Sequence, residues 1–290
     1  MSVELRSDAP LGVFDSGLGG LTVVRAIREA CPNEDIVYLG DNARVPYGTR
    51  SPDTVMRYAL TCSRELADRG VKAIVVACNT VSSVALEMLR AELDLPVSGV
   101  IVPGARAAAM AAGEAPVGVL GTAGTIASGA YTRAVAAESS RSEVIGQPAP
   151  LLVALAEEGW TDGDVPRLVI RRYLSAFFGP DRGPAFPRDA KVGCVVLGCT
   201  HFPLFRHLIE QELLDLGGRG IPVVDSAIQT AIDIEAFLEA RRLKKCAPSG
   251  ELRVLVTDMP KSFAEVASRF LGDAITSVEQ VDLKSSTGAS

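Results

Sequence analysis

The sequence predicts an α/β fold with two similar, doubly wound domains whose sheets are mostly parallel, and three observations support this prediction. Short apolar runs typical of buried strands alternate with amphipathic stretches typical of helices along most of the chain, as in parallel α/β proteins. Two of these units share one pattern, in which an apolar run, a cysteine, polar residues and a helix follow one another around Cys78 and Cys199. In addition, residues 11–16 (LGVFDS) resemble residues 117–122 (VGVLGT), and each segment precedes one cysteine unit.

The expected strands are the apolar runs that turn-forming residues separate. Their positions are residues 11–14, 35–39, 71–77, 95–101, 117–120, 143–146, 191–198, 221–225 and 251–257. The expected helices begin after a residue that can cap a helix, or with a proline, whose missing N–H costs nothing in the first turn. Their positions are residues 21–30, 51–69, 79–92, 103–112, a segment from about residue 128, 150–158, 165–178, 203–216, 226–243 and 261–271. Segments rich in turn formers at 15–20, 40–48 and 179–189 are expected to be loops, and 285–290 is expected to be disordered.

The repeat divides the chain into two α/β domains, each of which supplies one cysteine. We expect the first domain, which carries Cys78, to comprise residues 1–101 together with 228–273. The second domain, residues 102–227, carries Cys199, and residues 274–290 are expected to form a C-terminal tail. Because sites in open α/β sheets form at the carboxyl ends of strands, we expect the active site in the cleft between the two domains.

Charge, composition and cysteine usage exclude several classes of protein. A net charge of −6 disfavours a nucleic-acid partner, which attracts a basic surface. Residues 1–10 lack the apolar core of a signal peptide, and the apolar stretch 97–113 is too short and too interrupted to span a membrane. We therefore expect a cytoplasmic protein, in which six cysteines do not imply disulfides. With two histidines and no Cys-x-x-Cys motif, we expect no metal site, and no motif indicates pyridoxal or another cofactor.

The positions of Cys78 and Cys199 predict acid/base chemistry. A helix N-terminus favours a thiolate over a thiol, so a cysteine there can exchange protons. Two thiols on opposite sides of one cleft can remove a proton from one face of a stereocentre and return a proton to the other, which is the chemistry of a racemase or epimerase. Asp15 and His201 are candidate assistants that adjust the proton affinity of the nearer cysteine. The remaining cysteines are expected to be buried and inert: Cys31, Cys62, Cys194 and Cys246.

An ordered set of motifs over residues 10–273 resembles the motifs of the glutamate racemase family. The motifs are 14–22 (FDSGLGGLT), 40–48 (GDNARVPYG), 77–80 (ACNT), 198–204 (GCTHFPL), 224–227 (VDSA) and 257–263 (TDMPKSF). One such motif alone would be weak, whereas the complete set in this order is specific.

The resemblance implies a cofactor-independent racemase that interconverts L-glutamate and D-glutamate and provides D-glutamate for peptidoglycan synthesis. It also implies a homodimer of two-domain subunits. The catalytic acid/bases of the family fall on Cys78 and Cys199, and the catalytic set is completed by Asp15, His201 and Glu157. The substrate contacts of the family fall on Asp15, Ser16, Tyr47, Gly48, Asn79, Thr80, Thr122, Thr200 and His201.

The sequence departs from the family pattern around Glu157. Ala154 stands where a proline is expected, and the neighbouring Glu158 makes the register ambiguous, so the choice between the two glutamates stays open. Val81 replaces the small residue that usually follows the Asn-Thr pair. Neither departure affects the two cysteines.

Other functions fit part of the pattern. The same machinery could racemise aspartate or another acidic amino acid, and only the resemblance of segment 40–48 favours glutamate. A one-thiol lyase or decarboxylase would need one cysteine at the cleft, and an amino-acid-binding protein would need no reactive thiol. A thiol oxidoreductase would need its cysteines within bonding distance, whereas we expect a bound substrate to separate Cys78 from Cys199.

Overall fold

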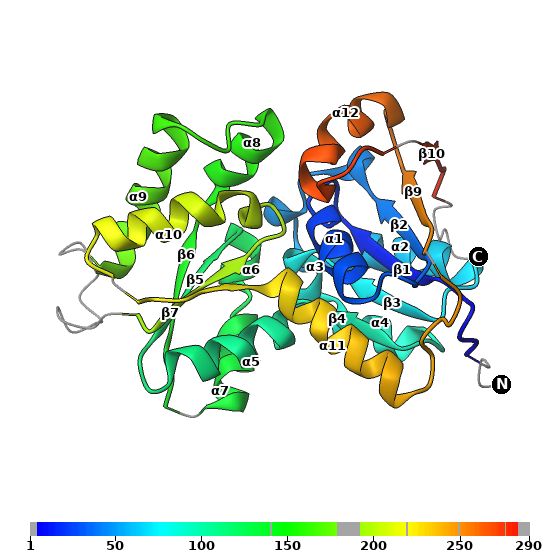
Figure 1. The fold of residues 1–290 in the computed structure, drawn as a ribbon, viewed down its shortest axis with the longest axis horizontal. Coiled ribbons are helices and arrows are strands. Elements are labelled where there is room, and N and C mark those ends of the chain that lie inside the picture. Colours follow the sequence, from blue (N-terminus) through cyan, green and yellow to red (C-terminus); the bar gives the residue numbers. More distant parts are fainter. Residues whose placement is uncertain are drawn as a thin grey trace.

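The computed structural model describes residues 5–139, 141–178, 192–218, 220–248, 250–275 and 277–283. The loop expected at 179–189, the disorder expected at 285–290 and the first residue of the strand expected at 191–198 lie outside these described residues. Figure 1 shows two sheets side by side, each covered by helices. The predicted α/β fold with parallel sheets is therefore confirmed.

The larger sheet has the strand order β10-β9-β2-β1-β3-β4. Every pair of neighbouring strands in it is parallel. The three strands β2, β1 and β3 are buried along their whole length, because helices cover both faces of a parallel sheet. The strands of this sheet are β1 (Leu11–Asp15), β2 (Ile36–Gly40), β3 (Ala73–Val76), β4 (Val97–Gly99), β9 (Leu252–Val256) and β10 (Val278–Gln280).

The smaller sheet has the strand order β6-β5-β7-β8 and is also parallel. Its strands are β5 (Val117–Gly121), β6 (Val144–Pro148), β7 (Cys194–Gly198) and β8 (Val223–Asp225). Gly121 at the end of β5 lies beside Gly198 at the end of β7. The loops that follow these two strands therefore leave the sheet at the same edge.

The segments between the strands form the helices that cover the two sheets (Figure 1). The longer helices begin as the sequence predicts: Ser51 caps α2 by accepting a hydrogen bond from the backbone N–H of Thr54. The α-helices are α1 (Leu21–Ala30), α2 (Pro52–Asp68), α3 (Asn79–Val84), α4 (Leu86–Glu92), α5 (Ile101–Ala112), α6 (Ala123–Ala127), α7 (Ala130–Glu138), α8 (Pro150–Glu158), α9 (Asp164–Phe178), α10 (Arg206–Asp215), α11 (Ser226–Ala240) and α12 (Pro260–Leu271). Short 3₁₀ turns occupy Asn42–Arg44, Tyr47–Thr49 and Phe202–Phe205.

Some expected helices differ in detail. The helix expected at 79–92 is divided at Ala85 into α3 and α4. In α3 the Ser83 hydroxyl donates to the backbone oxygen of Thr80, three positions earlier, and such local hydrogen bonds compete with regular helix. Helix α5 begins two positions before the expected start at Pro103, because proline is tolerated in the first turn of a helix.

Two expectations need correction, one about the C-terminal segment and one about Cys246. Within the tail expected at 274–290, the described residues include an edge strand, since β10 pairs with β9 and Val281 is buried. An edge strand of three residues is too short to show the alternation that identifies a strand in a sequence. Cys246 is exposed rather than buried, so its thiol is not a core side chain.

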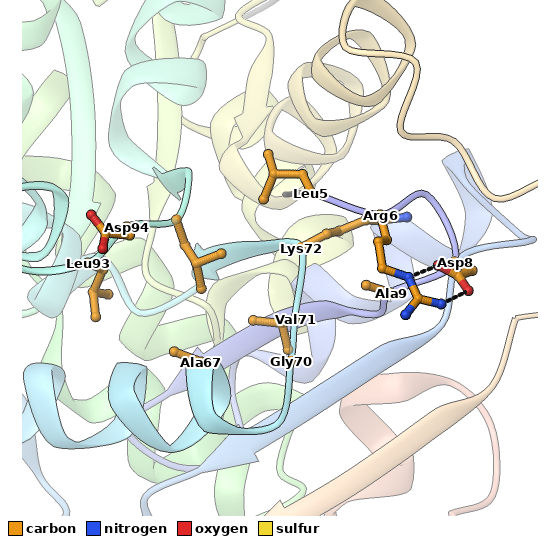
Figure 2. A pocket seen from close by; sticks show the side chains of 11 residues that line it. Leu5, Arg6, Asp8, Ala9, Ala67, Gly70, Val71, Lys72, Leu93 and Asp94 are labelled. Carbon is orange, nitrogen blue, oxygen red and sulfur yellow. Dashed lines mark hydrogen bonds and ion pairs between the residues drawn. The ribbon is translucent and has the colours of Figure 1, made fainter. Parts of the chain in front are cut away.

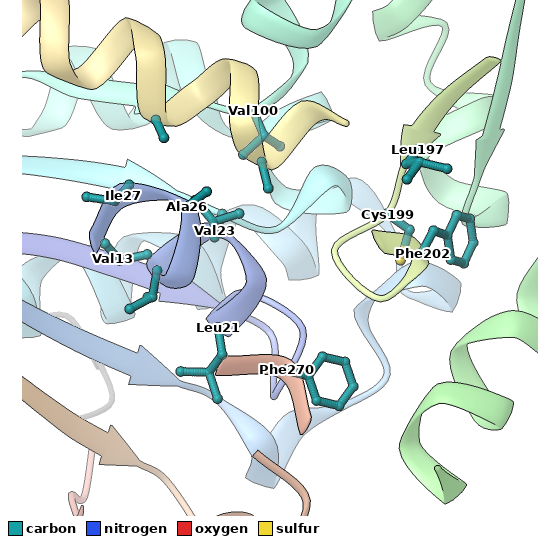
Figure 3. Close-up of a cluster of buried hydrophobic side chains, with 14 of the residues drawn as sticks. Val13, Leu21, Val23, Ala26, Ile27, Val100, Leu197, Cys199, Phe202 and Phe270 are labelled. Carbon is teal, nitrogen blue, oxygen red and sulfur yellow. The ribbon is translucent and has the colours of Figure 1, made fainter. Parts of the chain in front are cut away.

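One cluster of buried side chains continues from the larger sheet to the smaller one. Figure 3 shows Val13 and Leu21 in this cluster together with Leu197, Cys199 and Phe270. The contact between the sheets is therefore partly a packed core, which limits how far one sheet can move against the other. Among the described residues, every helix is too short or too polar to cross a bilayer, and their His, Cys, Asp and Glu side chains form no group that could hold a metal ion.

Candidate active site

A cavity of about 400 Å³ lies where loops from the larger sheet meet loops from the smaller sheet. Cys78 directly follows the Ala77 that ends the apolar run of β3, and Cys199 directly follows β7. Both cysteines line this cavity, although each is only 6% exposed. The carboxyl ends of two parallel sheets thus bring the two thiols to one site, as the sequence predicts.

The surroundings of Cys78 are acidic and hydroxylated. The hydroxyl oxygen of Ser16 lies 3.5 Å from the Cys78 sulfur. Asp15 lies behind this pair, fully buried, and its carboxylate accepts a hydrogen bond from the backbone N–H of Gly17. Burial, and then the nearby Asp15 carboxylate, raise the pKa of the Cys78 thiol to about 12. At neutral pH, Cys78 therefore carries its proton in the substrate-free site.

The surroundings of Cys199 are dominated by a histidine that pairs with a glutamate. The Nδ1 atom of His201 lies 3.7 Å from the Cys199 sulfur, and the Nε2 atom lies 3.1 Å from the Oε1 atom of Glu157. Burial alone would lower the pKa of His201, but the hydrogen bonds to Cys199 and Glu157 outweigh burial and raise it to about 10. His201 is therefore an imidazolium at neutral pH, whereas Cys78 faces a carboxylate.

The Gly-rich turn after β1 packs directly on the Cys199 loop. The Thr22 hydroxyl donates to the backbone oxygen of Thr200 at 2.9 Å. A Cβ atom at Gly19 would overlap the Thr200 hydroxyl and lie 2.6 Å from Nδ1 of His201. Only glycine allows this approach, so the turn from the larger sheet holds the cysteine loop of the smaller sheet in place.

Threonine hydroxyls form a small network on the cavity wall. The hydroxyl oxygens of Thr80 and Thr122 are 3.0 Å apart, and Thr122 also donates to the Thr125 hydroxyl at 2.9 Å. Thr122 caps α6 by accepting from the backbone N–H of Thr125. Thr80 belongs to α3 and Thr122 to the loop after β5, so the network joins the two sheets across the cavity.

Asn79 has the strongest signature of a ligand-binding side chain in the described part of the cavity. The residue is 2% exposed, and neither its amide nitrogen nor its amide oxygen has a hydrogen-bond partner among the described residues. Buried amides without partners are costly, so such a group is expected to bind a polar ligand. The Oδ1 atom of Asp15 is buried without a partner in the same way.

Tyr47 reaches the cavity from a loop that a buried ionic cluster anchors. Its hydroxyl donates to Oδ2 of Asp41. The guanidinium of Arg44 pairs with the same carboxylate at 2.7 Å, and the Thr257 hydroxyl donates to the other oxygen of Asp41 at 3.0 Å. Tyr47 is therefore held with its phenol turned inward, and burial raises the pKa of its hydroxyl.

Comparison with known proteins identifies the family. The sequence profile of the Asp/Glu/Hydantoin racemase family matches residues 11–231. The chain belongs to the Asp/Glu/Hydantoin racemase family. It is 46% identical to the glutamate racemase of Geobacter metallireducens over 94% of this chain and 97% of that protein.

Solved structures of this racemase family share the fold. The glutamate racemase of Francisella tularensis in complex with D-glutamate superimposes with a TM-score of 0.85 at 35% identity, covering 96% of this chain and 99% of that one. A glutamate racemase isoform of Bacillus anthracis gives a TM-score of 0.87 at 34% identity, again covering 96% and 99% of the two chains.

The structure brings nearly all predicted site residues of this racemase-family chain to one cavity. Asp15 is the exception, since it lies behind Ser16 and Cys78 rather than on the cavity wall. Glu157, and not Glu158, contacts His201. The predicted residues that line the cavity are Ser16, Tyr47, Gly48, Cys78, Asn79, Thr80, Thr122, Glu157, Cys199, Thr200 and His201.

Some residues of the site escaped the sequence-based prediction. Asp41 lies in a motif that was recognised, but its role in holding Tyr47 depends on contacts that the sequence does not show. Thr125 could have been found as the partner of a helix-capping Thr122 three positions earlier. Phe270, whose ring contacts the His201 ring, gave no signal, because its apolar side chain reads as ordinary helix core.

A second hollow of about 520 Å³ lies at the opposite edge of the larger sheet (Figure 2). Its wall includes Leu5, Val71 and Lys72, and none of the predicted site residues. The ammonium of Lys72 is fully engaged by Glu34 at 2.5 Å and by the backbone oxygens of Ser7 and Leu243. The buried Lys72 ammonium is therefore not free to bind a ligand in this hollow.

Proposed function

We propose that this protein is a glutamate racemase that uses Cys78 and Cys199 as two opposed acid/bases without a cofactor. The observation that carries the proposal is that both thiols line one cavity while they follow equivalent strands of two different sheets. Membership of the racemase family and the names of its relatives support glutamate as the substrate.

The proposed reaction needs only these two thiols. The thiolate sulfur of one cysteine takes the proton on Cα, and the electron pair of the broken C–H bond stays on the substrate. The other cysteine then donates its S–H proton to the opposite face of Cα. The first cysteine ends as a thiol and the second as a thiolate, and proton exchange with solvent restores the starting forms.

The two cysteine environments suit different halves of this reaction. Because its pKa is raised to about 12, Cys78 holds the proton that must be delivered when L-glutamate becomes D-glutamate. Cys199, beside the His201–Glu157 pair, removes the proton from L-glutamate in that direction. In the reverse direction, Cys78 removes the proton from D-glutamate, and His201 stays the proton-bearing neighbour of Cys199.

The polar groups on the cavity wall are assigned to the charged ends of the substrate. Asn79, whose amide atoms have no partner among the described residues, can bind both a carboxylate and an ammonium group. Asp15, which lies behind the wall beside Cys78, supplies negative charge on the side where the substrate ammonium is expected. The remaining substrate contacts are assigned to Ser16, Tyr47, Gly48, Thr80, Thr122, Thr200 and His201.

The same resemblance supports the cellular role and the assembly. We assign the protein to the cytoplasm as a homodimer that provides D-glutamate for peptidoglycan synthesis. One domain is assigned to residues 1–101 with 228–273, and the other to residues 102–227. The first range contains all strands of the larger sheet except β10, and the second contains all strands of the smaller sheet. Sedimentation analysis of the purified protein tests the dimer.

Circular dichroism of a glutamate solution tests the proposed function. Addition of the protein to L-glutamate should make the signal decay to zero, because the two enantiomers have equal free energy. L-Aspartate in a parallel experiment should keep its signal. A stable L-glutamate signal would contradict the proposal, and a faster decay with L-aspartate would favour an aspartate racemase.

A further inference from the structure

Helix α12 packs with the larger sheet and also contacts His201, in the loop that follows β7 of the smaller sheet. It follows β9 in the chain and packs against α1 and β10, which belong with the larger sheet. His201 follows β7 in the smaller sheet. The rings of Phe270 and His201 nevertheless lie 5.2 Å apart at an interplanar angle of 82°, an edge-to-face contact.

The neighbouring residue of the helix contacts the partner of His201. The Nη1 atom of Arg269 donates to the backbone oxygen of Glu157 at 3.3 Å. Gly159, two positions after Glu157, has a φ of +78°. The Arg269 guanidinium packs against it so closely that a Cβ atom at position 159 would overlap the guanidinium. Two adjacent residues of α12 therefore contact both members of the His201–Glu157 pair.

We propose that Phe270 and Arg269 are positioning residues that hold the His201 imidazole in line between Cys199 and Glu157. An imidazole ring contacts both partners only in one orientation, because its two nitrogens point in fixed directions. Phe270 is fully buried and closes one side of the ring. Arg269 fixes the backbone that carries the Glu157 carboxylate.

The charged surroundings of His201 allow this role to be measured. The titratable groups that face it are Cys199 from its own loop, Glu157 from α8 and Asp15 at the end of β1. Arg269 of α12 contacts the Glu157 backbone. If Phe270 no longer confines the ring, the hydrogen bonds to Cys199 and Glu157 loosen, and the pKa of His201 falls toward its ordinary value.

The test is a proton NMR titration of His201 in the substrate-free, full-length protein. The chain has two histidines, so the exposed His207 is removed by H207Q and one imidazole remains. Phe270→Leu keeps apolar volume without the ring and should lower the His201 midpoint by about one pH unit or more. Phe270→Tyr keeps the ring and should restore the midpoint. The matched control is Phe263→Leu, which removes another buried ring of α12 that contacts Tyr38 instead.

Activity gives a second readout, which rests on the proposed function. Phe270→Leu should lower kcat by on the order of tenfold with little change in KM. Since enantiomers are equal in free energy, kcat/KM must fall equally from L- and D-glutamate. The NMR midpoint involves no substrate, so a shifted midpoint in an enzyme inactive on glutamate would refute the proposed function alone.

The proposal can be decided whether or not Phe270→Leu folds. An unshifted His201 midpoint in folded Phe270→Leu would overturn it, and so would an equal shift in Phe263→Leu. If Phe270→Leu does not fold, the His201 midpoint is measured in Arg269→Gln instead. Arg269 is exposed, so its replacement should leave the core intact. A lowered midpoint in Arg269→Gln supports the proposal, and an unchanged one overturns it.

Discussion

The Nε2 atom of His201 lies 3.1 Å from the Oε1 atom of Glu157, although the two residues are 44 positions apart in the chain. The other ring nitrogen of His201 lies 3.7 Å from the Cys199 sulfur. Among the described residues, no such line of three groups reaches Cys78, which instead faces Ser16 and Asp15. Two cysteines in matching sequence contexts therefore sit in opposite electrostatic settings.

The first prediction concerns the two thiols. Cys78→Ala and Cys199→Ala should each lower racemisation in both directions by about 10²-fold or more, since each removes one acid/base group. Both variants should stay folded, because a methyl group replaces a thiol of similar size. Cys194→Ala is the control: Cys194 is also buried but lies at the start of β7 and does not line the cavity. Near-normal turnover in either test variant would refute the two-base scheme.

The second prediction concerns the origin of the product proton. In heavy water, starting from L-glutamate, deuterium should enter the newly formed D-glutamate well before it enters the remaining L-glutamate. The reason is that the proton delivered to the product comes from a cysteine that has already equilibrated with solvent. Mass spectrometry of the separated enantiomers at early times measures this. Equal early labelling of both pools, or an unlabelled product, would indicate one base that serves both faces.

The third prediction concerns the buried Asp15. Burial raises the pKa of its carboxyl group, so the folded protein binds this proton more tightly than the unfolded chain. Its contribution to stability is present below pH 3.8 and is lost as the pH rises through the folded-state pKa. At pH 7, Asp15→Asn should therefore increase the free energy of unfolding by about 1–3 kcal/mol.

Urea unfolding of Asp15→Asn at pH 7 and at pH 3 measures this effect. The gain should vanish at the lower pH, where the wild-type carboxyl is also uncharged. Activity should fall in the same variant, since the negative charge beside Cys78 is lost. Asp162→Asn, at an exposed position, should change neither property. A less stable Asp15→Asn variant at pH 7 would contradict the argument.

The fourth prediction concerns His201 and the stability of the fold at high pH. Its pKa is raised to about 10, so its contribution to stability is complete below pH 6.5 and is lost as the pH rises through 10. Glu157→Gln should reduce this loss. The reduction should be no more than about 1 kcal/mol, because the half-exposed Glu157 side chain is screened by solvent.

Unfolding midpoints at pH 6 and pH 10 measure the loss. Glu158→Gln, at the neighbouring exposed position, is the control and should behave as wild type. If Glu158→Gln had the larger effect, the pairing of His201 with Glu157 would be wrong.

The fifth prediction concerns the close approach at Gly19. In Gly19→Ala the new methyl group would overlap the Thr200 hydroxyl, so the loop that carries Cys199 must move. We expect kcat/KM to fall on the order of 10²-fold, because small displacements of a catalytic group are costly. Gly118→Ala is the control, since its methyl group would meet the Phe177 ring at 3.2 Å in the core, away from the cavity. It should lower stability while the remaining folded protein keeps its activity.

The sequence by itself determined the fold class and most of the site. Strands and helices follow from local apolar periodicity, and a cysteine at the end of a buried strand must lie at the carboxyl edge of a parallel sheet. For that reason the sequence alone predicts that Cys78 and Cys199 lie in one cleft. The ordered motifs resemble those of one family, and each motif lies at the carboxyl edge of a sheet, where the candidate site is built.

The tertiary structure decided which side chains lie beside the two thiols. Nothing local distinguishes Glu157 from Glu158, and only the rotation of α8 against the smaller sheet turns Glu157 toward His201. Phe270 reads as core in the sequence, and its ring reaches His201 only because α12 crosses to the other sheet. Likewise, the opposite charge environments of Cys78 and Cys199 arise from residues distant in the chain. Such contacts depend on how whole elements pack, which local sequence patterns do not encode.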